Sequence, residues 1–211
     1  VEGGARVERT TAKSRPIDAS RAFTALSGSL GASVAVADGW RIGVNGSRSE
    51  RAPSAEELFA DGPHKGTQAF EIGDPDFAKE RAWGLEAVLK GGGQGYRLEA
   101  SAHWSRYRNF IYETPTGDIE DDLPVFEFRQ QKARIWGVEA EASVDVAEVG
   151  GTTVSVDALG DYVRASLPGV GPVPRIPPLR LLGGVEADGD IWGGRVEVEW
   201  ADDQNRTAAF E

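Results

Sequence analysis

The chain consists largely of segments of about ten residues or more in which apolar and polar side chains alternate strictly. A period of two is the pattern of a β-strand whose two faces lie in different environments. Apolar faces of this kind include Trp40, Ile42 and Val44; Trp83, Leu85, Ala87 and Leu89; Trp136, Val138, Ala140 and Ala142. The alternation predicts about nine strands, near residues 1–10, 22–37, 40–50, 80–90, 96–112, 125–146, 152–164, 179–187 and 191–201. The sequence therefore predicts an all-β, antiparallel fold.

Two architectures can accommodate strands with one apolar and one charged face. In a soluble β-sandwich ligand-binding module, the apolar faces pack between two sheets and the charged faces meet water. In a transmembrane β-barrel, the apolar faces meet lipid and the charged faces line a wet lumen. Aromatic residues near the ends of apolar faces suit the girdles of a barrel and favour the second architecture; they are Trp40, Trp83, Tyr96, Trp104, Trp136, Tyr162, Trp192 and Trp200.

The connections between the predicted strands alternate in length. Short connections are predicted at 38–39, 91–95, 148–151 and 188–190, and long ones at 11–21, 51–79, 114–123 and 165–177. Short periplasmic turns and long outer loops are the expected asymmetry of an outer-membrane barrel. No stretch approaches eighteen consecutive apolar residues, which argues against a helical span. A passive porin-like barrel is an alternative that these patterns leave open.

Composition excludes several classes of function. The net charge is −11, with 23 basic and 34 acidic residues and no basic stripe, so no nucleic acid partner is expected. There is no cysteine, the two histidines lie on different predicted elements, and the glycines at 91–93 lack the lysine of a phosphate-binding loop. We therefore expect neither an enzyme nor an intrinsic cofactor.

The connection at 51–79 is much longer than an ordinary hairpin loop, and such lengths are usually functional or disordered. Ser54 with Glu57 three residues later has the spacing of a capping box ahead of Leu58, which predicts a short helix. Gly62-Pro63 is predicted to end that helix. These signals indicate an ordered loop.

The same stretch carries a family resemblance. The motifs follow one another in order: Arg51-Ala-Pro-Ser-Ala-Glu-Glu-Leu-Phe59, Gly62-Pro-His64, Phe70-Glu-Ile-Gly-Asp-Pro75, Glu80, Asn109-Phe-Ile-Tyr112, Leu123-Pro-Val125, Gly137-Val-Glu-Ala-Glu141, Gly160-Asp-Tyr-Val163 and Pro174-Arg-Ile-Pro-Pro-Leu-Arg180. They resemble the barrel of TonB-dependent outer-membrane receptors, over nearly the whole chain from about residue 20. The nearest branch is the one associated with zinc uptake.

This resemblance implies an energised importer in the outer membrane of a Gram-negative bacterium. Residues 1–211 would be a segment from the latter half of a 22-stranded barrel, without the plug domain and the final strands. The implied partners are outer-membrane lipid, a small nutrient ligand, and the TonB–ExbB–ExbD complex acting through the plug. The implied cargo is a metal ion or complex, with zinc favoured over an iron siderophore or haem.

The candidate ligand residues lie mainly in the predicted outer loops. His64 shares its loop with Asp61, Glu71, Asp74 and Asp76, and zinc accepts imidazole nitrogen together with carboxylate oxygen. His103 faces the predicted lumen. A solvent-exposed or hydrogen-bonded histidine is the alternative at both positions.

Two further groups flank these candidates. An acidic loop that would gather cations, or simply be solvated, contains Asp118, Glu120, Asp121 and Asp122. An aromatic cluster of Tyr107, Phe110 and Tyr112 would stack a flat ligand or belong to a girdle. Glu139 and Glu141 are predicted to be solvated or paired with Arg134 or Arg97.

Overall fold

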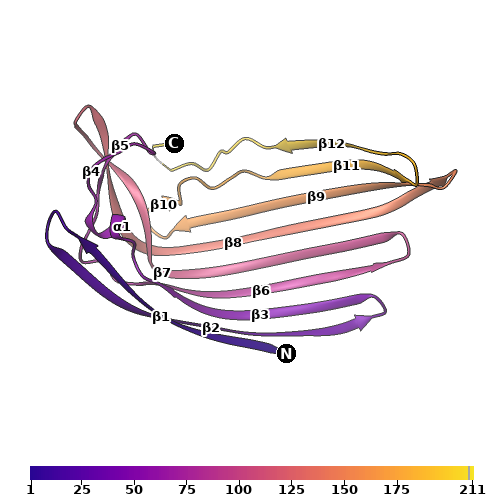
Figure 1. Cartoon of the computed structure of the whole chain (residues 1–211), viewed down its shortest axis with the longest axis horizontal. Coiled ribbons are helices and arrows are strands. Elements are labelled where there is room, and N and C mark those ends of the chain that lie inside the picture. Colours follow the sequence, from indigo (N-terminus) through magenta and orange to yellow (C-terminus); the bar gives the residue numbers. More distant parts are fainter. Residues whose placement is uncertain (209) are drawn as a thin grey trace.

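The computed structural model describes residues 1–208 and 210–211 and consists of one large sheet with a short helix at one end (Figure 1). The elements are β1 (Glu2–Ser14), β2 (Ala19–Ala37), β3 (Trp40–Arg51), α1 (Ala55–Phe59), β4 (Asp61–His64), β5 (Ala69–Ile72), β6 (Glu80–Gly93), β7 (Tyr96–Glu120), β8 (Leu123–Val149), β9 (Thr152–Leu167), β10 (Gly171–Pro172), β11 (Arg180–Gly189) and β12 (Gly193–Ala201). The helix is far too short to cross a membrane, and the described residues contain no helix long and apolar enough to do so.

The main path of the sheet follows the chain without a crossover, in the order β1-β2-β3-β6-β7-β8-β9-β11-β12. Each neighbouring pair on this path is antiparallel, and these nine strands correspond to the nine that the alternation predicts. The three remaining strands, β4, β5 and β10, are short pieces within the long connections. The predicted all-β antiparallel fold is confirmed.

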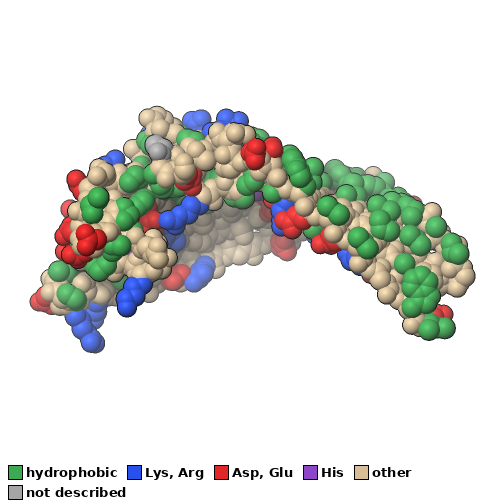
Figure 2. Space-filling model, turned by 90° about the horizontal axis from the view of Figure 1, so that it is seen from above, with side chains coloured by type: hydrophobic (Ala, Val, Ile, Leu, Met, Phe, Trp, Pro, Cys, Tyr) green, Lys and Arg blue, Asp and Glu red, His purple; other side chains and the backbone are tan. Residues whose placement is uncertain are grey.

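The sheet is a curved wall with chemically different sides. In Figure 2, acidic and basic side chains occupy the hollow of the curve, while hydrophobic side chains gather on its outer surface. Trp83 is 62% exposed and Val196 is 73% exposed, because no second sheet covers the apolar face in the described part of the chain. This arrangement contradicts the soluble sandwich, which requires the apolar faces to be buried against each other.

Charged side chains in the hollow form cross-strand ion pairs. Arg97 lies 2.5 Å from Glu141, as the sequence predicted, and Arg195 lies 2.6 Å from Asp157. Arg134 does not take part, because it is the register partner of Arg106 on the same face as Trp136, the outer face. The prediction that Arg134 pairs with the luminal glutamates is therefore wrong.

Several strands are longer than predicted at the end that carries the long connections. Strand β7 continues to Glu120 and β8 begins at Leu123, so Asp118 and Glu120 are strand residues rather than loop residues. Only Asp121 and Asp122 form the turn, both with positive φ, which aspartate tolerates. The predicted loop at 114–123 is therefore wrong, because backbone pairing continues there after the clear alternation of side chains has ended.

Other predicted boundaries shift for the same reason. The connection predicted at 11–21 shrinks to residues 15–18 because β1 and β2 stay paired up to Ser14 and Ala19. The glycines at 91–93 belong to β6, which leaves a turn at 94–95. At the other end, β12 begins at Gly193 rather than at residue 191, and exposed Trp192 lies outside it.

Packed side chains gather at the end of the wall that carries α1 and the long connections. One core cluster contains Ala12, Leu58, Phe77 and Ile111, with Phe23, Phe59 and Phe128 packed against it. A second contains Ala133, Ala165, Leu167 and Val173, with Tyr107, Phe110, Tyr112, Ile135 and Ile176 packed against it. The long connections are therefore folded onto the wall, and this end of the molecule has an interior of its own.

Candidate metal site

The short helix α1 starts at a complete capping box. The backbone N–H of Glu57 donates to Ser54 Oγ at 3.1 Å, and the backbone N–H of Ser54 donates to Glu57 Oε2 at 2.7 Å. This confirms the helix predicted from the Ser54 and Glu57 spacing. The predicted end is too late, because Gly62-Pro63 lies in strand β4 and the helix ends at Phe59.

Two anchors fix α1 to the wall. The guanidinium of Arg51 donates to both carboxylate oxygens of Glu57, at 2.8 and 2.9 Å, and its Nε lies 2.5 Å from Glu80. Glu80 is buried and also accepts the backbone N–H of Ile111 at 2.6 Å. On the other side of the helix, Leu58 is fully buried in the first core cluster. The position of α1 is therefore set by both polar and apolar contacts.

The β4–β5 hairpin lies directly against α1. The backbone N–H of Gly73 donates to the Ala60 carbonyl at 2.8 Å, and that of Asp74 donates to the Glu57 carbonyl at 3.0 Å. A Cβ at Gly73 would lie 2.7 Å from the backbone nitrogen of Phe59, so only glycine permits this approach. Strand β5 also pairs in parallel with β8. The loop is thereby closed over the end of the wall.

This packing brings together Glu56, His64 and Glu71, which we call the Glu–His–Glu group. One potential ligand atom of each lies within 4.8 Å of the other two. His64 Nδ1 is 2.9 Å from Glu71 Oε1, and His64 Nε2 is 3.6 Å from Glu56 Oε1. Glu71 also accepts a hydrogen bond of 2.6 Å from Thr67 Oγ1. The side chains of His64 and Glu56 are 47% and 54% exposed, whereas Glu71 is only 3% exposed.

The charges around the group are mutually dependent. The hydrogen bond to Glu71, together with the charge of that carboxylate, raises the pKa of His64. Burial raises the pKa of nearby Glu113, and the charge of Glu71 adds to that increase. Arg175 lies 3.2 Å from Glu113 and opposes it. The site thus concentrates acidic side chains around one imidazole.

The geometry gives the three residues different roles toward a cation. A hydrogen bond from Nδ1–H to buried Glu71 would fix the tautomer of His64 and leave the lone pair of Nε2 free, on the side of Glu56. A carboxylate behind a ligating histidine is a common arrangement at metal sites. His64 Nε2 and the Glu56 carboxylate therefore suit a zinc-like ion that accepts mixed nitrogen and oxygen ligands, with further positions open to water or cargo.

The other acidic candidates of this loop lie apart from the group. Asp61 is exposed on β4 and belongs to no ligand group that the described residues form. Asp74 Oδ1 accepts the backbone N–H of Asp76 at 2.8 Å, which makes the two part of a turn. Both aspartates and Tyr112 line an open cavity of about 580 Å³. No cation-binding role follows from these positions.

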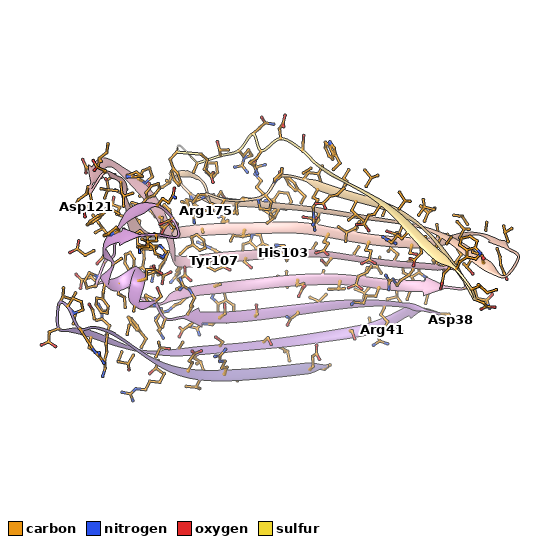
Figure 3. All side chains as sticks on the ribbon, turned by 45° about the horizontal axis from the view of Figure 1, so that its top comes forward. Asp38, Arg41, His103, Tyr107, Asp121 and Arg175 are labelled. Carbon is orange, nitrogen blue, oxygen red and sulfur yellow. The ribbon has the colours of Figure 1, made fainter. Side chains whose placement is uncertain are left out.

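His103 lies near the middle of β7, on the same face as the luminal charges and far from the loop end (Figure 3). Its register partners are Glu86 and Gly137. A Cβ at Gly137 would lie 2.6 Å from the imidazole, so the ring of His103 lies across that glycine. Figure 3 also shows Asp121 at the tip of the β7–β8 hairpin, away from His103. The acidic residues and His103 therefore do not share one site.

The aromatic candidates are mostly packing residues. Tyr107 and Phe110 contact each other edge to face, with ring centroids 5.3 Å apart, and both pack on the second core cluster. Phe110 and Tyr112 also line an open cavity of about 320 Å³ together with Glu113 and Arg175. A flat ligand could reach these two rings only through that cavity.

Sequence reasoning missed Glu56 and Glu113. Glu56 lies in the first turn of the predicted helix, where an acidic residue is expected simply to favour the helix dipole. Glu113 was placed at the border of a loop. Only the docking of the β4–β5 hairpin against α1 and β8 shows that both carboxylates lie beside His64.

A curved antiparallel wall with an apolar outer face, a charged hollow and aromatic residues near both ends of its strands defines the class: the wall of a transmembrane β-barrel. Residues 1–210 match the family model described as "TonB dependent receptor-like, beta-barrel". The chain belongs to this family. Its members are bacterial outer-membrane receptors and transporters rather than enzymes, and the outer-membrane location predicted from the sequence is confirmed.

Solved structures of the same fold include three metal-related transporters and receptors. The copper transporter OprC is 22% identical, with a TM-score of 0.81, over 98% of this chain and 33% of its own. The FrpB iron transporter of Neisseria meningitidis (F3-3 variant) is 17% identical, with a TM-score of 0.60, over 92% and 30%. The siderophore receptor PirA of Pseudomonas aeruginosa is 14% identical, with a TM-score of 0.59, over 84% and 34%. The chain thus spans about a third of the length of these proteins.

Proposed function

We propose that this chain is part of a receptor that captures a metal ion at the outer surface and imports it across the outer membrane. The family membership supports a receptor over a passive porin. The names of similar structures refer to copper, iron and siderophores, which supports a metal-related cargo. The observation that carries the proposal is the Glu–His–Glu group in the folded outer loop.

The donor set favours a borderline divalent cation, with zinc as the first choice. Imidazole nitrogen suits zinc and copper, whereas a site for calcium or magnesium would consist of oxygen ligands alone. Exposure of His64 and Glu56 leaves them accessible to an arriving ion, while buried Glu71 holds the imidazole in position. The group therefore combines access from outside with a fixed orientation.

Import requires a second stage in which cargo leaves the loop and enters the barrel. The hollow of the wall carries charged pairs, and His103 lies within it, part of the way along β7. We propose transient contact of the ion with His103 during this stage. Energy would come from the TonB–ExbB–ExbD complex acting on a plug domain, as in the family that the chain belongs to.

A metal complex is the second candidate cargo. The open cavity of about 320 Å³ beside Phe110 and Tyr112 also presents Glu113 and Arg175. Aromatic faces with a nearby guanidinium would suit part of an iron–siderophore complex or the edge of a haem. This candidate predicts binding that depends on Tyr112 and Arg175 rather than on His64.

Calorimetry on the complete receptor in detergent tests the first candidate. We expect His64→Ala and Glu56→Gln each to weaken zinc binding at least tenfold, a loss of about 1.4 kcal/mol. Asp61→Asn is the matched control, because Asp61 is an exposed carboxylate of the same loop outside the group. Equal zinc affinity in wild type and both variants would contradict the proposed site, and binding of an iron chelate or haem instead would favour the second candidate.

A further inference from the structure

Five basic side chains gather on the outer face of the wall, at the end that carries the long loops. We call Arg106, Arg108, Lys132, Arg134 and Arg164 the basic cluster; they lie on β7, β8 and β9, and all five are exposed. Intervening residues point the other way, since Tyr107, Ala133 and Ala165 belong to the second core cluster. The cluster therefore projects away from the hollow and from the proposed metal site.

The basic cluster lacks acidic partners, unlike most cations in this protein. Within the described residues, no carboxylate oxygen lies within 4.0 Å of any of its five side chains. By contrast, Arg97 and Arg195 in the hollow each have a carboxylate partner. With 34 acidic residues against 23 basic ones, a shortage of carboxylates does not explain this. The arrangement separates these cations from the acidic groups.

The register places like charges directly opposite each other. Arg106 on β7 is the partner of Arg134 on β8, and Arg108 is the partner of Arg81 on β6. Directly opposite side chains in antiparallel strands have Cβ atoms about 4.5–5.5 Å apart, and like charges there are destabilising. Arg81 is compensated by Glu50 at 3.2 Å, whereas Arg106 and Arg134 have no such compensation within the described residues. An anion between Arg106 and Arg134 would turn the repulsion into two attractive contacts.

The aromatic residues fix the depth of the cluster in the membrane. Arg106 is the next outward-facing residue after Trp104, and Arg134 is the next before Trp136. Trp136 contacts Tyr162 edge to face, with ring centroids 5.6 Å apart, so the aromatic row continues onto β9. Such rows lie at the membrane interface in outer-membrane barrels. The basic cluster is thus one step beyond the apolar band, at headgroup depth, on the side of the outer loops.

We propose that the basic cluster binds the phosphate groups of a lipid in the outer leaflet. Arginine forms bidentate, charge-assisted hydrogen bonds to phosphate, and basic clusters beside membrane-spanning segments bind anionic headgroups. The site faces lipid rather than the lumen, so its ligand is membrane lipid and not the imported cargo. This inference is independent of the proposed metal site, because the two lie on opposite faces of the wall.

The test uses the complete receptor, stripped of lipid in detergent and titrated with lipid A, which carries two phosphates. Bound lipid is counted by native mass spectrometry, and Tm is measured with and without it. We expect lipid A to bind wild type and raise its Tm, and the double variant Arg106→Gln/Arg134→Gln to bind at least tenfold more weakly. Arg15→Gln/Arg41→Gln is the matched control, because it removes the same charge at exposed positions elsewhere and should bind like wild type.

Two further arms separate recognition of the lipid headgroup from binding of acyl chains, from binding of free phosphate and from simple loss of stability. Without lipid, the double variant should have a Tm equal to or above that of wild type, because a repulsion has been removed. Dephosphorylated lipid A and inorganic phosphate should leave the Tm of wild type unchanged. Equal lipid A binding by wild type and the double variant would overturn the proposal. So would an equal response of wild type to either control ligand, or a lower Tm of the double variant without lipid.

Discussion

His64 is the residue on which the proposed metal site depends. Its ordinary neighbours in the sequence, Pro63 and Lys65, say nothing about its role. The role comes from contacts across the folded loop, with Glu71 at Nδ1 and Glu56 on the side of Nε2. The sequence predicted His64 and Glu71 as candidates because residue type and loop membership are readable locally. It missed Glu56 because the distance between α1 and the hairpin depends on tertiary packing.

Zinc binding at His64 should depend on pH in a defined direction. The carboxylate of Glu71 raises the pKa of His64 above its ordinary value of 6.5. A protonated imidazole cannot ligate a metal, so zinc affinity should fall as pH decreases through this raised pKa, by about tenfold per unit below it. Without metal the sign is opposite: the protonated His64–Glu71 pair stabilises the loop fully below pH 6.5, and this contribution is lost as pH rises through the raised pKa.

Calorimetric titrations of the complete receptor between about pH 6 and pH 8.5 check this expectation. In His64→Ala, residual binding through carboxylates should show little change over the same range, because their protonation lies mostly at lower pH. Zinc affinity that is constant with pH in wild type would exclude the imidazole as a ligand.

The outer loop at residues 51–79 is the element that turns a bare wall into a candidate receptor site. Its helix was predictable because a capping box is a local signal, and its N-terminal geometry matches that prediction. Strands β4 and β5 were not predicted, since their partners are each other and the distant β8. Strand ends were also misplaced: in β7 the alternation weakens beyond Tyr112, while backbone pairing continues to Glu120. Periodicity reports the environment of side chains, and hydrogen bonding extends beyond the region where that environment is uniform.

Leu58→Ala tests whether the loop is held by its own core. Leu58 is fully buried against Ala12, Phe77 and Ile111, and truncating a buried leucine costs about 2–5 kcal/mol. We expect faster hydrogen exchange across residues 52–79 and weaker zinc binding, with the long strands unaffected. Val170→Ala, at an exposed loop position, is the control and should change neither. Unchanged exchange in Leu58→Ala would mean that the loop does not depend on this core.

The whole molecule is a wall with three separate surfaces. The outer face carries apolar side chains with aromatic residues and the basic cluster near the loop end, the hollow carries ion pairs and His103, and the loop end carries the Glu–His–Glu group. The alternation predicted the two faces because each is a repeated, local pattern. A strand count of 22 for the complete barrel stays a prediction, as does the choice of zinc. These depend on residues and ligands outside this chain.

Zinc uptake by intact cells that carry the complete receptor tests the proposed capture of zinc most directly. We predict energised uptake by wild type that is lost when the TonB complex is absent, and that is strongly reduced at low zinc concentration by His64→Ala or Glu56→Gln but not by Asp61→Asn. Receptor levels in the membrane must be equal in all strains. Equal zinc uptake by wild type and the two site variants would contradict capture at the Glu–His–Glu group.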